Sequence, residues 1–275
     1  MAPLAAPGPP AAIRFHFDIG SPYAYLAAER IDALMPAPVT WSPVLLGGIY
    51  KETGRVSWAT TSGREDGIRE IEHRAAAYGL PPLGWPEVMP GDRLLAMRAA
   101  VAADECGAGR EFARAAFRLQ FAEGRAISDP AVLGLAAERA GLAADALLAA
   151  AVEPGVNARP RALTDAALTA GVVGVPTVEV GIGDPPHPLH WGDDRLEAAA
   201  ADALRRFARA WIAAWNAHDL DAIMAHCRED VRFRSPLVRR IAGAPGGELR
   251  SAGALRAYFR AGLAAFPDLR FTLES

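Results

Sequence analysis

The chain has 275 residues, a length that suggests about two domains, each able to bury a core. Its net charge of −3 shows no basic excess that points to nucleic acid, and no apolar run approaches the roughly 20 residues of a membrane span. The two cysteines, Cys106 and Cys227, lack CxxC spacing, so the sequence predicts neither a disulfide framework nor a dithiol site. We therefore expect a cytoplasmic protein, with the Ala- and Pro-rich residues 1–12 as a disordered tail, not a signal peptide.

The most informative segment is Asp18 to Tyr23, Asp-Ile-Gly-Ser-Pro-Tyr, where a predicted strand passes into a predicted helix. Apolar and polar residues alternate over 13–19, which is typical of a strand. Pro22 suits the first turn of a helix, with Ser21 as its cap. Ser21 would then lie at a helix N-terminus, where unpaired N–H groups and the helix dipole favour an anion. Taken alone, these residues favour the simpler interpretation that Ser21 only caps the helix.

The rest of the first domain alternates strands and helices around a large helical block. Further strands are predicted at 39–44, 175–180 and 189–191. Helical spacing dominates about 64–151, and another helix runs from about 161 to Gly171. This order predicts an α/β domain of thioredoxin-like fold with an inserted helical subdomain.

A long final helix is predicted from about Asp194, with an apolar stripe from Leu204 to Trp215. We place a domain boundary within it near Asp202, so the domains are 13–202 and 203–275. The second domain is expected to hold a helix capped by Asp219, a short strand at 231–234, a helix at 255–263 and the start of a strand at 269–273.

Two basic features leave their interpretation open. Of the 29 basic residues only Lys51 is a lysine, which suggests a place where a compact ammonium is needed, although chance placement is an equal alternative. His187 and His190 lie in a Pro-rich loop, where a solvated pair is favoured over a metal site. We assign no metal ligands.

Five segments, in order across about residues 13–200, resemble the 2-hydroxychromene-2-carboxylate isomerases. These are relatives of the kappa-class glutathione transferases in the DsbA-like thioredoxin branch. The segments are 17–23, 43–51, 94–99, 171–177 and 191–196. The resemblance implies a glutathione-dependent isomerase with an aromatic carboxylate substrate, as in bacterial degradation of naphthalene-like compounds.

The resemblance also implies roles for individual residues. Ser21 takes the place of the family's active-site serine beside the glutathione sulfur, and Lys51 that of a lysine on the substrate side. The backbone of Val175, before a family cis-proline at Pro176, would pair with the cysteinyl part of glutathione. The segment matched to the γ-glutamyl end comprises Gly192, Asp193, Asp194 and Arg195. Without the family, that segment is only acidic capping of a helix start.

Two residues depart from the family, which usually has Asn followed by Thr or Ser where this chain has Asp92 and Arg93. We assign both to the substrate side. Asp92 would repel a carboxylate substrate unless Arg93 or Lys51 compensates. The loop at 183–188 also looks longer and richer in proline than the family's turn. Both departures bear on substrate identity more than on the use of glutathione.

The expected mechanism follows from thiolate chemistry. A serine cannot form mixed disulfides, so Ser21 excludes redox exchange from this position. Its hydroxyl at a helix N-terminus would lower the pKa of a bound thiol. The glutathione thiolate would add to a conjugated carbon, allow rotation and leave again, while Lys51 holds the substrate carboxylate or stabilises the enolate. The alternatives are a kappa-like glutathione transferase or peroxidase using Ser21, and a non-catalytic thioredoxin-fold binding module.

The residues from about 204 resemble part of a SnoaL-like α+β cone, related to nuclear transport factor 2. The segments that carry this resemblance are 211–221, Ser235-Pro236 and 258–268. Family cones continue through several more strands, so we assign no catalytic residue here, and we interpret Trp211 and Trp215 as core. The apolar face of this partial cone, with Phe259 and Phe266, would lack its usual cover, and we therefore expect a homodimer.

Overall fold

The computed structural model describes residues 13–181, 187–241, 243–244 and 246–273. The expected tail at 1–12 and most of the loop at 183–188 lie outside these ranges. The chain divides at Asp202 into two compact units, one of residues 13–201 and one that holds the residues from 202 onward. Among the described helices, none has the length and the apolar content that crossing a membrane requires.

The first unit is built on a four-stranded sheet in the order β2-β1-β3-β4. The strands are β1 (Ile13–Phe17), β2 (Val39–Pro43), β3 (Thr177–Val180) and β4 (Leu189–Trp191). β1 pairs in parallel with β2 and antiparallel with β3, and β3 pairs antiparallel with β4. A parallel pair joined by a helix and extended by antiparallel strands confirms the predicted thioredoxin-like α/β fold.

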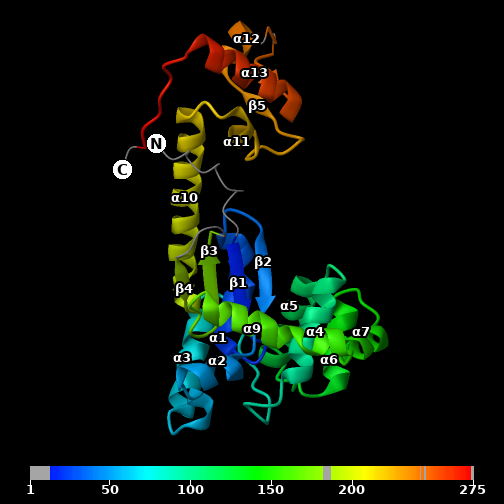
Figure 1. Ribbon diagram of the computed structural model, residues 1–275. Helices are drawn as coiled ribbons and strands as arrows, with labels where there is room; N and C mark the ends of the chain where they lie inside the picture. The colour runs from blue at the N-terminus through cyan, green and yellow to red at the C-terminus, as the bar shows by residue number, and fades with distance from the viewer. Residues whose placement is uncertain (1–12, 182–186, 242, 245, 274–275) are drawn as a thin grey trace. The chain divides into compact units, whose positions relative to one another are not determined.

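Helices fill the connections between these strands. They are α1 (Pro22–Leu34), α2 (Leu46–Thr53), α3 (Arg64–Ala77), α4 (Leu94–Glu105), α5 (Gly109–Phe121), α6 (Pro130–Arg139), α7 (Ala144–Ala151), α8 (Pro154–Asn157) and α9 (Arg159–Thr169), with 3₁₀ turns η1 (Trp58–Thr60) and η2 (Asp193–Arg195). The helices α3 to α7 occupy the segment in which helical spacing predicted an insertion. Figure 1 shows α4 to α7 gathered in a bundle at one side of the sheet.

The central strand β1 is covered on both faces. Phe15 and Phe17 point to one face, where the Phe17 ring lies 5.8 Å from the ring of Phe117 on α5. His16 points to the opposite face and is nevertheless only 3% exposed. The alternation of apolar and polar residues therefore separates two buried environments, not a core from solvent.

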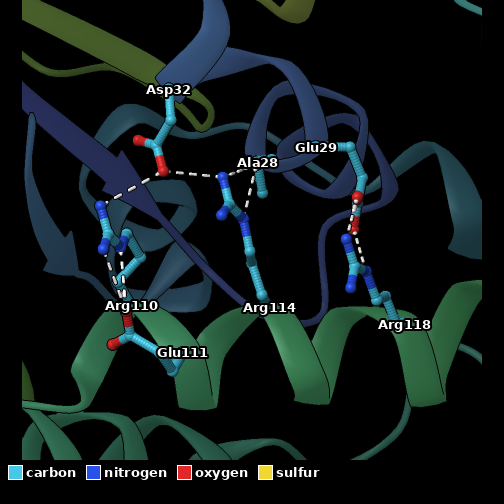
Figure 2. Close-up of polar contacts among 7 residues, drawn as sticks. All are labelled: Ala28, Glu29, Asp32, Arg110, Glu111, Arg114 and Arg118. Carbon is cyan, nitrogen blue, oxygen red and sulfur yellow. Dashed lines mark hydrogen bonds and ion pairs between the residues drawn. The ribbon is translucent and has the colours of Figure 1, made fainter. Parts of the chain in front are cut away.

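Charged side chains fasten the helical bundle to α1. Three arginines spaced four residues apart on α5 form a row that reaches α1 (Figure 2). The Arg118 guanidinium donates two 2.8 Å hydrogen bonds to the Glu29 carboxylate. Arg114 donates to the carbonyl of Ala28 and to the Asp32 carboxylate. Because a two-pronged contact fixes direction as well as distance, these pairs orient α5 on α1, the helix that begins beside Ser21.

The sheet also buries an ionisable pair. His16 Nε2 lies 3.1 Å from Glu179 Oε2, and Arg14 Nε lies 3.8 Å from the same oxygen. The hydrogen bond with His16 holds the pKa of Glu179 below its usual value, against the opposing effect of burial. A carboxyl with a lowered pKa stabilises the fold above its ordinary pKa, and this contribution disappears as the pH falls through the pKa in the folded state.

We predict that Glu179→Gln lowers the free energy of unfolding at pH 7 by about 1–3 kcal/mol, because His16 loses a charged partner. The difference from the wild type should shrink as the pH falls below about 4.5, the ordinary pKa of a glutamate carboxyl, and disappear as the pH falls through the lower pKa that Glu179 has in the folded state. Urea unfolding between pH 3 and pH 7 measures this. Glu65→Gln, at a side chain that is 86% exposed, is the control and should change little. A Glu179→Gln effect that is constant with pH would contradict the assignment.

The second unit is small and mostly helical. Its elements are α10 (Leu196–Asn216), which begins in the first unit, then α11 (Leu220–Met224), β5 (Phe233–Arg234), α12 (Pro236–Ile241), β6 (Glu248–Leu249) and α13 (Ala252–Ala265). The Asp219 carboxylate accepts a hydrogen bond from the Ala222 backbone N–H, as the predicted cap requires. The strand expected at 269–273 is wrong, since Phe271 instead exchanges hydrogen bonds of 2.7 and 2.9 Å with the Asn216 side chain.

Aromatic side chains form the core of this unit. The Trp215 and Phe259 rings meet edge to face at 4.8 Å. Trp211 and Trp215 both pack against the buried cluster that includes Ile223. This packing agrees with the interpretation of the two tryptophans as core. Phe266 is 50% exposed and Phe207 is 41% exposed, so the expectation of an incompletely covered apolar face is met in part. The homodimer stays a prediction.

Candidate functional site

A cavity of about 330 Å³ lies at the N-terminal end of α1 in the first unit. Its walls come from the start of α1, one face of α2, the segment before α4, the segment before β3 and the turn after β4. Five of the ten residues proposed from the sequence to bind ligands or substrate lie in its β3 and β4 walls: Val175, Pro176, Gly192, Asp193 and Asp194. Ser21 and Arg93 line it from the other side.

Ser21 occupies the helix start that the sequence predicts. Its Oγ accepts a 3.2 Å hydrogen bond from the Ala24 N–H, so it does cap α1, and the residue is only 3% exposed. The hydroxyl proton is not used by this bond. The backbone N–H of Tyr23 has no partner among the described residues, as expected in a first helical turn. Ser21 is therefore both a cap and a hydrogen-bond donor at the edge of the cavity.

The buried carboxylate of Asp18 holds this corner together. Its Oδ1 accepts from the Gly20 N–H, and its Oδ2 accepts from the Leu46 N–H, both at 2.8 Å. The same Oδ2 lies 3.4 Å from Nε of Arg93. Asp18 is 1% exposed, so its charge is balanced within the protein. One carboxylate thus fixes the turn before Ser21, the start of α2 and the position of Arg93.

The opposite wall is the segment before β3. The Val175–Pro176 peptide is cis, as the family resemblance implies. Val175 is buried, and its backbone N–H and C=O have no hydrogen-bond partner within the described ranges. The Pro176 carbonyl accepts from the Gly192 N–H at 2.9 Å. The wall therefore presents a free backbone donor and acceptor to the cavity, at a place held by β3 and β4.

The two aspartates of the turn after β4 have different environments. Asp193 is buried, with Oδ1 2.9 Å from Nη1 of Arg74 and Oδ2 accepting from the Tyr78 hydroxyl at 2.9 Å. Burial, with help from the Asp193 hydrogen bond, raises the pKa of Tyr78. Burial alone would lower the pKa of Arg74, but the carboxylates of Asp193 and Glu70 outweigh it and raise that pKa. Asp194 is exposed and lines the cavity. Asp193 therefore ties the turn to α3, and Asp194 is the aspartate open to a ligand.

Tyr23 extends this network along the cavity wall. Its hydroxyl donates to Glu70 Oε2 at 3.2 Å, and Glu70 also pairs with Arg74 at 2.6 Å. Burial and the neighbouring Glu70 raise the pKa of Tyr23 to about 12. The phenol is therefore protonated at neutral pH and already committed to Glu70 as a donor.

Three of the proposed residues do not face the cavity. Arg195 and Lys51 are absent from its lining, and Asp92 turns its Oδ1 back to the Leu94 N–H at 2.9 Å, capping α4. The concern that Asp92 repels a carboxylate therefore does not apply to this cavity. Arg93, by contrast, lines the cavity and lies over Gly20, where a Cβ would come within 2.5 Å of its Cδ.

Lys51 does not line this cavity, and its substrate-side role stays a prediction. On α2, Leu46 and Tyr50 are one turn apart and share the face that lines the cavity. Lys51 is one residue further, about 100° around the helix. It is exposed and lines a different groove, beside Arg161 on α9. Tyr50 is the α2 side chain that the cavity receives.

Sequence reasoning missed Tyr50, Arg74 and the anchoring role of Asp18. The spacing of Glu70, Arg74 and Tyr78 places them on one helical face and could have indicated a polar row. Nothing in the sequence could show that this row meets Asp193, which is 115 residues from Tyr78. Within the described residues, no group of three or more His, Cys, Asp or Glu side chains could hold a metal ion.

We predict that Asp18→Asn destabilises the protein by about 2–4 kcal/mol, since an amide cannot accept from both backbone N–H groups and leaves Arg93 without its counter-charge. Chemical denaturation measures the loss. Asp92→Asn, which also removes a charge that caps a backbone N–H but at an exposed site, should cost less than about 1 kcal/mol. Equal effects of the two substitutions would show that Asp18 is not the anchor.

Comparison with known proteins agrees with this architecture. The family model of the DSBA-like thioredoxin domain matches residues 12–204, and that of the SnoaL-like domain matches residues 208–275. No curated protein matches the chain. Among solved structures, a 2-hydroxychromene-2-carboxylate isomerase superposes with a TM-score of 0.60 at 24% identity, covering 72% of this chain and 98% of that chain.

Two further structures share the fold. A probable DsbA oxidoreductase from Streptomyces coelicolor has a TM-score of 0.54 at 20% identity, covering 71% of this chain and 90% of that chain. A candidate protein disulfide isomerase from Nitrosomonas europaea has a TM-score of 0.56 at 16% identity, covering 72% and 98%. These likenesses establish the fold. With a family model matched over most of its length, this chain belongs to the DSBA-like thioredoxin family and carries a SnoaL-like domain after it.

Proposed function

We propose that the protein is a glutathione-dependent isomerase acting on an aromatic catabolite of the 2-hydroxychromene-2-carboxylate type. The observation that carries the proposal is Ser21, a hydroxyl donor at the N-terminus of α1 in a cavity whose lining holds no cysteine. The two cysteines of the chain are Cys106, exposed on the first unit, and Cys227 in the second. Because no cysteine thiol lines this cavity, the protein cannot carry out dithiol–disulfide exchange there. This favours an isomerase activity over the oxidoreductase activity of proteins that share its fold.

The cavity offers groups that fit glutathione. The free backbone N–H and C=O of Val175 suit the peptide-like middle of the molecule, as an added strand would. Asp194 and the N-terminus of η2 suit its charged γ-glutamyl end, with the paired Asp193 holding that turn in place. Ser21 and the free N–H of Tyr23 would serve as hydrogen-bond donors to a thiolate at the N-terminus of α1. These fits support the proposal.

When bound, glutathione would supply a thiolate that adds to a conjugated carbon of the substrate and leaves after bond rotation, so that no electrons are gained or lost. Ser21 would donate a hydrogen bond to the sulfur, and the positive end of α1 would favour its charge. Arg93, held by Asp18, would attract a substrate carboxylate. The apolar walls, including Leu46, Met89 and Trp58, would receive the aromatic ring.

We predict that Ser21→Ala binds glutathione nearly as well as the wild type but loses most of the isomerase activity. The backbone and Asp194 contacts survive, while the thiolate loses a charged hydrogen bond worth about 1.5–3 kcal/mol. The thiol pKa of bound glutathione should rise by about 1–2 units, which ultraviolet absorbance of the thiolate measures. Calorimetric titration measures the affinity.

Ser251→Ala is a matched control for this variant. Ser251 caps α13 in the same way, accepting from the Ala254 N–H at 3.2 Å, but it lies in the second unit. Both variants lose a cap worth about 1 kcal/mol, and only Ser21→Ala should lose activity. An unchanged thiol pKa in Ser21→Ala would remove Ser21 from the mechanism. Stoichiometric consumption of glutathione during turnover would identify a transferase in place of an isomerase.

A further inference from the structure

The cavity lining includes one tyrosine, Tyr50, to which the proposed function assigns no role. Tyr50 lines the cavity, is half-buried, and its hydroxyl has no partner among the described residues. The other cavity phenol, Tyr23, is already bonded to Glu70. The Tyr50 hydroxyl is not one of the buried polar atoms that lack a partner, so it is accessible, and a phenol that lines the cavity can donate a hydrogen bond to a ligand bound there.

The position of Tyr50 is set by the same anchor that sets Ser21. Asp18 Oδ2 accepts from the Leu46 N–H at the first residue of α2 and lies beside Nε of Arg93. Tyr50 follows Leu46 by one turn on the same helical face. One carboxylate therefore brings a phenol donor and a guanidinium to the same end of the cavity, next to the turn that carries Ser21.

We propose that Tyr50 is a catalytic residue of this site, whose hydroxyl donates a hydrogen bond to the substrate oxygen that gains negative charge during isomerisation. This rests on the proposed function. No proton needs to leave the hydroxyl, because the negative charge that reaches the oxygen when the thiolate adds returns to the sulfur when the C–S bond breaks. Arg93 adds a positive charge at the same oxygen or at the carboxylate beside it.

The chemistry of this phenol suits the role. Burial raises the pKa of Tyr50, so it is a neutral donor across the physiological pH range. The charge of Arg93 acts against this increase in the pKa, and the charge of Asp18 adds to it. A neutral phenol beside a cation stabilises a developing oxyanion without repelling the ground-state carboxylate.

The test uses the full chain and a probe that needs neither glutathione nor turnover. 4-Nitrophenol reports its own ionisation by absorbance, and its phenolate mimics the charged oxygen. We expect the wild type to favour the bound phenolate and Tyr50→Phe to bind it about tenfold more weakly, a shift of about one pKa unit for the bound probe. Glu52→Gln, an exposed position two residues further on the same helix and outside the cavity lining, is the control and should bind within twofold of the wild type.

With a 2-hydroxychromene-2-carboxylate substrate and glutathione, Tyr50→Phe should lower kcat by about 100-fold and change KM by less than about threefold. Equal phenolate binding by the wild type and Tyr50→Phe, no phenolate binding by the wild type, or a loss confined to Glu52→Gln would overturn the assignment. A calorimetric titration that shows no glutathione binding would instead overturn the proposed function. The phenolate measurement does not use glutathione, so it would still test whether Tyr50 donates a hydrogen bond to a charged oxygen.

Discussion

The site depends on one buried carboxylate. Asp18 is 1% exposed, and its two oxygens accept from the backbone of Gly20 and Leu46 and face Nε of Arg93. These partners belong to three segments that are far apart in sequence: the turn after β1, the start of α2 and the residue before α4. A buried charge must be matched on every side, so none of the three segments can move without leaving it unpaired. The start of α1, which carries Ser21, follows directly after the turn that Asp18 holds and is therefore fixed in position as well.

A second paired carboxylate does the same for the opposite wall. Asp193 is bound by Arg74 and Tyr78 from α3, and the Arg30 side chain of α1 donates to its backbone carbonyl at 3.1 Å. The helical insertion is therefore part of the site's framework, since α3 holds the turn after β4. The arginine row of α5 adds an independent link from the insertion to α1. Both ends of the cavity are therefore fixed by charge pairs, Asp18 with Arg93 at one end and Asp193 with Arg74 at the other.

Much of the fold was readable because it depends on local patterns. Alternation at 13–19 and the Ser-Pro pair predict β1 and the start of α1 without any knowledge of neighbours. The sequence did not predict which side chains of a short helix face the cavity. Lys51 and Tyr50 are adjacent, and only the packing of Ile49 into the core decides that Tyr50 turns to the cavity and Lys51 to solvent. Lys51 drew attention because it is the single lysine of the chain, whereas nothing in the sequence distinguished Tyr50 from the other four tyrosines.

Long-range pairing and edge strands were the other limits. No local sequence pattern indicates that Asp18 pairs with Arg93. A charged residue is normally expected to face solvent, and the sequence alone does not show that Asp18 is buried. In the second unit, the apolar alternation at 269–273 predicts a strand, but a strand needs a neighbour. The described sheet there pairs only β5 with β6, two residues each, and Phe271 bonds to the Asn216 side chain instead. Elements whose hydrogen bonds and packing involve residues close in sequence were predicted correctly. Elements that need a partner from a distant part of the chain could not be predicted without the folded structure.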